Sequence, residues 1–213
     1  MRELDVHEGQ TLALLGFDAA MAEVFVSLIT AAALPDTGEV RVEGRPTSDV
    51  TDSDAWLALL ERFGLLTHRT VLVDRLTTEE NLAIPFTLDL AGAADAVRRQ
   101  VRGLAEEIGL DPAEMSVPVA TISPLAQMRV RLGRALALAP RLVLAEHPNA
   151  MLSADDTPVF AAEFSRIISR RGAATVVFTA DQRFASAVAD QVLTLQPATG
   201  ELTRASGWRR WFS

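Results

Sequence analysis

Acidic and histidine side chains follow two apolar stretches of the chain, where catalytic groups are often found. Glu146 and His147 come directly after the apolar run Leu-Val-Leu-Ala, and Asp18 and Glu23 follow the run Thr-Leu-Ala-Leu-Leu. A carboxylate can bind a magnesium ion, and a histidine can act as a general base. Asp18 could instead accept hydrogen bonds from the free N–H groups at the start of the helix that follows it.

The other residue types exclude several kinds of chemistry. The chain has no cysteine, which rules out disulfides, thiolate metal sites and cysteine nucleophiles. Its three histidines, His7, His68 and His147, are far apart in the sequence and lack the spacing of metal ligands, so we expect no metal site. The formal net charge of -8 gives no electrostatic support to nucleic-acid binding.

Apolar runs and amphipathic segments alternate along the chain and predict strands and helices in turn. The expected strands cover residues 11–15, 40–43, 63–66, 142–145, 174–178 and 192–195. The expected helices cover residues 19–33, 54–62, 93–108, 124–138, 158–171 and 184–188. Ser123 is a favoured N-cap and Pro124 is tolerated at the first helical position, which supports a helix from 124. This alternation predicts an α/β fold with a mainly parallel sheet.

Four stretches, in the correct order, resemble the ATP-binding subunit of ABC transporters. They are Leu34-Pro35-Asp36-Thr37-Gly38-Glu39-Val40 with Gly44-Arg45, Leu76-Thr77-Thr78-Glu79-Glu80-Asn81-Leu82, Gln127-Met128-Arg129-Val130 with Arg134-Ala135-Leu136-Ala137, and residues 142–148. The resemblance covers residues 3–200. It implies one P-loop NTPase-like ABC ATPase domain over residues 1–213, with a mainly parallel sheet, a small antiparallel β part and a helical subdomain. Residues 64–119 would form the glutamine-loop region and the helical lobe.

The segment aligned with the phosphate-binding loop of that family is altered. Such a loop uses glycines to wrap the phosphates, a lysine for the β and γ phosphates and a hydroxyl for magnesium. Gly16 keeps the first glycine and Met21 replaces the last one. Ala22 stands at the lysine position and Glu23 at the hydroxyl position. A carboxylate such as Asp18 or Glu23 would repel a phosphate charge by about 4 kcal/mol at roughly 4 Å and an effective dielectric near 20. We therefore expect this loop to bind no ATP.

The resemblance places substitutions at the other catalytic positions as well. Glu146 aligns with the Walker B aspartate and His147 with the catalytic glutamate. His68 aligns with the glutamine of the glutamine loop, Ser153 with the D-loop aspartate and Ala180 with the switch histidine. The family's first strand and its adenine-stacking aromatic residue would lie ahead of the first residue of this chain. The resemblance thus implies a degenerate site that does not hydrolyse ATP.

Two features leave alternatives open. Ser123 keeps the serine of the signature motif, which in this family contacts the γ-phosphate bound by the opposite subunit, and it could equally be only a helix N-cap. The C-terminal residues 207–213 contain Trp208-Arg209-Arg210-Trp211-Phe212, a mixture that suits a membrane interface or a partner's groove. A tail folded back on its own domain would have the same composition.

The resemblance implies a non-catalytic subunit, a pseudo-ATPase, with a structural or regulatory role in transport. It would pair with an active ABC ATPase in a heterodimer and dock on an integral membrane permease; ATP and magnesium would be held by the partner. The sequence shows no secretory signal and no stretch apolar enough to span a bilayer, so we expect a cytoplasmic protein at the inner face of the cell membrane. Two alternatives are an atypical active ATPase that uses Glu146 and His147, and a soluble interaction module outside transport.

Overall fold

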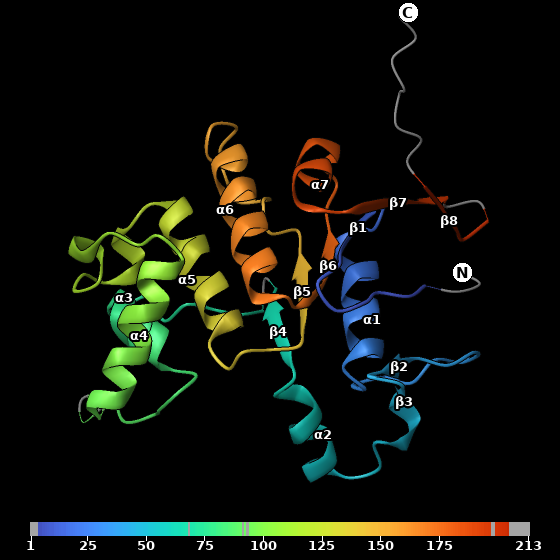
Figure 1. Cartoon of the computed structure of the whole chain (residues 1–213), viewed down its shortest axis with the longest axis horizontal. Helices are drawn as coiled ribbons and strands as arrows, with labels where there is room; N and C mark the ends of the chain where they lie inside the picture. The colour runs from blue at the N-terminus through green and yellow to red at the C-terminus, as the bar shows by residue number, and fades with distance from the viewer. Residues whose placement is uncertain (1–3, 68, 91, 93, 197–198, 205–213) are drawn as a thin grey trace, which may run out of the picture.

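A six-stranded sheet with strand order β4-β5-β6-β1-β7-β8 lies at the centre of the protein. The computed structural model describes residues 4–67, 69–90, 92, 94–196 and 199–204, arranged as in Figure 1. The parallel strands are β1 (Thr11–Leu15), β4 (Phe63–Leu66), β5 (Leu142–Glu146), β6 (Ala174–Phe178) and β7 (Gln191–Gln196). The edge strand β8 (Glu201–Arg204) runs antiparallel to β7. The predicted α/β fold with a mainly parallel sheet is confirmed.

Successive side chains of each central strand pack into apolar clusters on opposite faces of this sheet. In β1, Leu12 and Leu14 belong to a cluster with α1, whereas Ala13 and Leu15 belong to a second cluster with the helices of the other face. The helices concerned are α1 (Ala19–Ile29) on one face and α5 (Pro124–Leu136), α6 (Asp156–Arg171) and α7 (Gln182–Val188) on the other. Burial on both faces explains why these strands are continuous apolar runs.

Two smaller groups of elements flank the sheet. α3 (Thr78–Ala83) and α4 (Asp95–Glu107) pack with α5 and form the helical group at the left of Figure 1. β2 (Arg41–Val42) and β3 (Arg45–Pro46) form a short antiparallel pair, followed by α2 (Ser53–Leu60). Single 3-10 turns cover Thr47–Asp49, Pro112–Glu114 and Val119–Thr121. The fold therefore contains the expected small antiparallel part beside a helical group.

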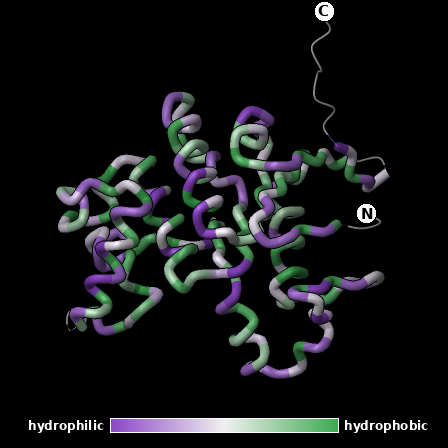
Figure 2. Tube along the Cα trace, in the orientation of Figure 1, coloured by the Kyte–Doolittle hydropathy of each residue, from purple (hydrophilic) through white to green (hydrophobic). Residues whose placement is uncertain are grey.

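Helix α1 is shorter than the predicted helix 19–33. Its last residue is Ile29, and the Thr30 hydroxyl donates to the carbonyl of Val26 at 2.8 Å. Ala31 then takes a φ of 56°, a left-handed conformation that cannot continue the helix. Figure 2 shows hydrophilic residues interspersed along the helices, and within the described part of the chain no helix is long and apolar enough to cross a membrane.

Candidate functional site

The loops that follow β1, β5 and β6 meet at the carboxyl ends of neighbouring strands. β1 pairs with β6 and β6 pairs with β5, all in parallel, so these loops leave the sheet at the same edge. In open α/β sheets this edge is where ligands bind. It brings together the segment from Gly16 to Glu23, the pair Glu146 and His147, and Ala180.

The loop after β1 is anchored by a glycine and an aromatic side chain. Gly16 has a φ of 83°, and a Cβ there would lie 3.2 Å from the carbonyl oxygen of Leu195, so a larger residue would be both strained and crowded. The ring of Phe17 packs edge-on against Phe25 at 5.2 Å and Phe178 at 5.5 Å between ring centroids. Phe17 thus joins the loop to the apolar cluster beneath α1.

The first turn of α1 offers a carboxylate and apolar groups to this edge of the sheet. Asp18 accepts a hydrogen bond from the N–H of Met21 at 2.8 Å, so it is the N-cap of α1, as expected from its position in the sequence. Ala22 is completely buried in the apolar cluster, and Met21 is 38% exposed. The turn therefore supplies neither an ammonium nor a hydroxyl group, and its capped N–H is already bonded. These residues do not fit the chemistry of a magnesium–polyphosphate site.

An arginine that the sequence reasoning missed lies between the two acidic residues of this edge. Nη1 of Arg69 is 3.0 Å from Oε1 of Glu23, and its Nη2 is 3.6 Å from Oε1 of Glu146. The side chain of Glu146 is 2% exposed, whereas those of Arg69 and Glu23 are each 47% exposed. A carboxylate as buried as Glu146 needs a cationic partner or a proton, and the guanidinium supplies the charge.

The turn after β5 is fixed by its backbone. His147 has a φ of 45°, and its N–H donates to the carbonyl of Phe178 at 2.8 Å. Its Nε2 atom is buried and has no hydrogen-bond partner among the described residues. The backbone of His147 is thus fixed in a left-handed conformation, while its half-buried ring has no hydrogen bond at Nε2 from the described part of the chain.

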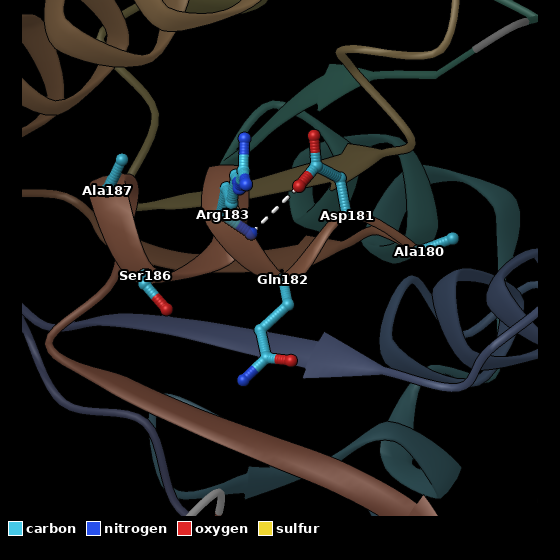
Figure 3. A pocket seen from close by; sticks show the side chains of 6 residues that line it. All are labelled: Ala180, Asp181, Gln182, Arg183, Ser186 and Ala187. Carbon is cyan, nitrogen blue, oxygen red and sulfur yellow. Dashed lines mark hydrogen bonds between the residues drawn. The ribbon is translucent and has the colours of Figure 1, made fainter. Parts of the chain in front are cut away.

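Polar side chains link this turn to the loop after β6. Thr179 donates to the side-chain oxygen of Asn149 at 2.9 Å, and the amide of Asn149 donates to Asp181 at 3.4 Å. Asp181 also accepts from the N–H of Arg183 at 2.8 Å, which caps α7, as the dashed line in Figure 3 marks. A surface pocket beside Ala180 is lined by Ala180, Asp181, Gln182, Arg183, Ser186 and Ala187. At the aligned switch position this pocket presents a methyl group.

Two serines from the predicted site bond to N–H groups in the first turns of helices. Ser123 accepts a hydrogen bond from the N–H of Ala126 at 3.1 Å and is the N-cap of α5, as expected. Ser123 is an exposed residue. Ser153 donates to the carboxylate of Asp156 at 2.7 Å and accepts from its N–H at 3.0 Å, at the start of α6. Capping leaves open whether Ser123 also contacts a phosphate. His68 and residues 207–213 lie outside the described residues.

Comparisons with known proteins agree on one family. The sequence profile described as ABC transporter matches residues 2–150. The chain is 32% identical over 203 residues to the sulfate/thiosulfate import ATP-binding protein CysA 2 of Chromobacterium violaceum, with 94% of this chain and 52% of that protein covered. It is 30% identical over 193 residues to an uncharacterized ABC transporter ATP-binding protein of Mycobacterium tuberculosis, with 90% and 76% covered.

Other relatives and solved structures extend this result. The methionine import ATP-binding protein MetN of Brucella abortus is 28% identical, with 90% of this chain and 51% of that protein covered. This chain thus spans about half the length of CysA 2 and MetN. The dimeric bacterial ABC transporter cassette MJ0796 superposes with a TM-score of 0.75 at 22% identity, covering 90% of this chain and 83% of that one. CbiO1 of Clostridium perfringens gives 0.77 at 15% identity, covering 90% and 75%.

Proposed function

The chain belongs to the ABC transporter family, and from that premise we propose that it is a non-catalytic cassette subunit with a structural or regulatory role in a transporter. Its curated relatives are named as ATP-binding proteins of import systems. We propose that this subunit joins a transporter as those relatives do, but that it does not bind nucleotide itself. It also puts the protein in the cytoplasm, at the inner face of the membrane that holds the permease.

The first turn of α1 is the observation that carries the proposal. Ala22 is buried among apolar side chains, so no ammonium is directed at this edge of the sheet from that position. Asp18 fills the anion-binding end of α1 with its own carboxylate. Glu23 and Glu146 add two further carboxylates, and Arg69, which lies beside both, balances the charge of only one of them. These carboxylates would repel a bound polyphosphate, because both are negatively charged.

The partners follow from how such subunits pair. A second copy of this chain would bring a second loop of the same composition, so a homodimer would have no complete site. We therefore propose a heterodimer with an active ABC ATPase, docked on an integral membrane permease. In that pair the partner's loop would hold ATP and magnesium, opposite Ser123 of this chain.

Calorimetry with magnesium and ATP tests the proposal directly. We expect no heat of binding and no thermal stabilisation of the isolated chain up to millimolar ATP. A site with a Kd one hundred times below the ATP concentration would stabilise the fold by about 2.7 kcal/mol, which a thermal melt detects easily. A complete ABC ATPase measured in parallel is the positive control.

A micromolar Kd would contradict the proposal and favour an atypical active ATPase. In that case steady phosphate release by the wild-type chain, lost in His147→Ala, would identify His147 as the group that acts on water. A separate purification from detergent extracts of the native host tests the partners. Recovery of a permease together with an ATPase that has a complete loop supports a transport subunit, whereas recovery of soluble proteins alone favours an interaction module.

A further inference from the structure

The segment between β4 and α3 is held by three different parts of the protein. We define this connecting segment as residues 67 and 69–76. The side chain of Asn81, completely buried in α3, accepts from the N–H of Val73 at 2.9 Å and donates to its carbonyl at 3.1 Å. Arg134 of α5 donates to the carbonyl of Val71 at 2.8 Å. These bonds fasten the later part of the segment to the helical group.

Arg69 fastens the early part of the same segment to the sheet. Its guanidinium reaches Glu23 on α1 with one nitrogen and Glu146 at the end of β5 with another. The same part of the segment also forms local bonds, from the N–H of Arg69 to the hydroxyl of Thr67 at 3.2 Å and from the hydroxyl of Thr70 to the carbonyl of Leu65 at 3.0 Å. Arg69 is therefore the side chain by which this segment contacts both α1 and the end of β5.

The charges explain why a cation must lie there. Glu23 and Glu146 come from different elements, and both have an oxygen within 3.6 Å of the same guanidinium. The burial of Glu146 makes its negative charge costly unless a positive charge stays beside it. Two carboxylates beside one cation are also a ligand set that a hydrated divalent cation accepts.

We propose that Arg69 is a tethered cation that occupies the place between Glu23 and Glu146 and thereby holds the connecting segment on the sheet without any bound ligand. The position of the early part of this segment then depends on a covalently attached charge, and no nucleotide or metal is required for it. The subunit would present one constant arrangement of the connecting segment to whatever binds beside it. This inference does not rest on the proposed function, because it concerns the unliganded chain.

Amide hydrogen exchange of the purified chain, in the absence of nucleotide, tests the proposal. We expect Arg69→Ala to speed exchange by about fivefold or more at residues 70 and 71, and less at residues 72–76, where Asn81 and Arg134 still hold the segment. Glu23→Ala, at a half-exposed position that leaves the core intact, should give a smaller increase at the same amides. Arg69→Lys should lie near the wild type. The matched control is Arg75→Ala, which removes an exposed charge of the same segment that has no ion pair among the described residues.

Divalent cations provide the second arm. In Arg69→Ala, 10 mM MgCl₂ should slow exchange at residues 70–76 relative to NaCl of equal ionic strength. The double variant Arg69→Ala/Glu23→Ala lacks one of the two carboxylates and should not respond. The proposal is overturned if exchange in Arg69→Ala equals that of the wild type or of Arg75→Ala, or if magnesium has the same effect as NaCl in Arg69→Ala. ATP binding by the wild-type chain would contradict the proposed function and leave this result untouched.

Discussion

The carboxylate of Asp18 stabilises a helix at a position where a bound phosphate would require a positive or neutral group. Its carboxylate bonds the N–H of Met21 and stabilises the first turn of α1. The same charge stands at the helix end that attracts anions, and so competes with any phosphate that would bind there. Under the proposed function, capping of α1 and repulsion of phosphate are thus two effects of one carboxylate.

Replacing Asp18 tests whether its hydrogen bond or its charge stabilises the first turn of α1. Asp18→Ala should lower the free energy of unfolding by about 1 kcal/mol, because the N–H of Met21 loses its acceptor. Asp18→Asn should stay close to the wild type, because the amide oxygen can accept the same bond without the charge. Urea denaturation of both variants measures this. If Asp18→Asn were as destabilised as Asp18→Ala, charge and not capping would be what stabilises α1.

The residues that were predictable from the sequence are those whose roles depend on close neighbours. The caps by Asp18 and Ser123 were predictable because each acts on an N–H three residues further along the chain. Arg69 was not, because its partners Glu23 and Glu146 approach it only when α1 and β5 are assembled beside the connecting segment. No local spacing in the sequence predicts such a contact.

At the scale of elements, the same distinction applies. The predicted strands 11–15, 63–66 and 174–178 match β1, β4 and β6, because a strand buried on both faces has to be apolar throughout. Helix α3 was missed although Thr77 and Glu80 form a capping box at its start, since its six residues are too few for a clear periodicity. Strand β8 was missed because it is mostly exposed.

Ion pairs join the helical group to the sheet's own helices. Arg129 of α5 contacts Glu163 of α6 through two bonds of 2.9 and 2.6 Å, and this pairing raises the pKa of Arg129 above its ordinary value against the opposing effect of burial. Arg171 at the end of α6 binds Glu107 of α4 in the same two-pronged way. These two ion pairs join α6 to α5 and to α4.

Breaking the first of these pairs should destabilise the chain. Arg129→Ala should lower the free energy of unfolding by about 2 kcal/mol, because a mostly buried Glu163 loses two charge-assisted hydrogen bonds. The control is Arg41→Ala, whose partner Glu39 is well exposed, and which should cost less than about 0.5 kcal/mol. Equal effects in urea denaturation would mean that the α5–α6 pair contributes no more than a surface contact.

Gly64 tests how closely β4 packs against α5, and Gly103 of α4 is its control. A Cβ on Gly64 would lie 2.5 Å from the carbonyl oxygen of Ala135 and 2.9 Å from Cγ of Pro140, so Gly64→Ala should cost about 2 kcal/mol through overpacking. Gly103 lies on the exposed side of α4, where a Cβ would meet no atom within 4 Å, so Gly103→Ala should stabilise by about 1 kcal/mol through helix propensity. In thermal melts we expect the melting temperature to fall in Gly64→Ala and to rise in Gly103→Ala. A Gly64→Ala variant as stable as the wild type would show that α5 can move away from β4.

At the scale of the whole molecule, the proposed function divides the protein into a retained framework and an altered edge. The sheet, its two apolar clusters and the helical group follow the fold of solved ABC cassettes, with a TM-score of 0.75 for one of them. The site positions that the sequence comparison predicts to be altered after β1, β5 and β6 lie at the carboxyl ends of these strands, on one edge of the sheet. A framework kept intact around such an edge is what a subunit needs if its surfaces, and not its own site, serve the assembly.

Pairing with an active ATPase gives the last prediction, which rests on the proposed function. Such a pair should bind one ATP, not two, because only the partner's loop would hold phosphates. Ser123→Asp should weaken that binding about tenfold, equivalent to about 1.4 kcal/mol, by placing a negative charge beside the phosphate. Ser123→Asn keeps an equally good N-cap for α5 and adds no charge, so it should bind like the wild type. Equilibrium dialysis of the purified pair measures both stoichiometry and affinity. Two bound nucleotides would mean that the loop of this chain binds ATP after all, and an unchanged affinity in Ser123→Asp would reduce Ser123 to a helix cap.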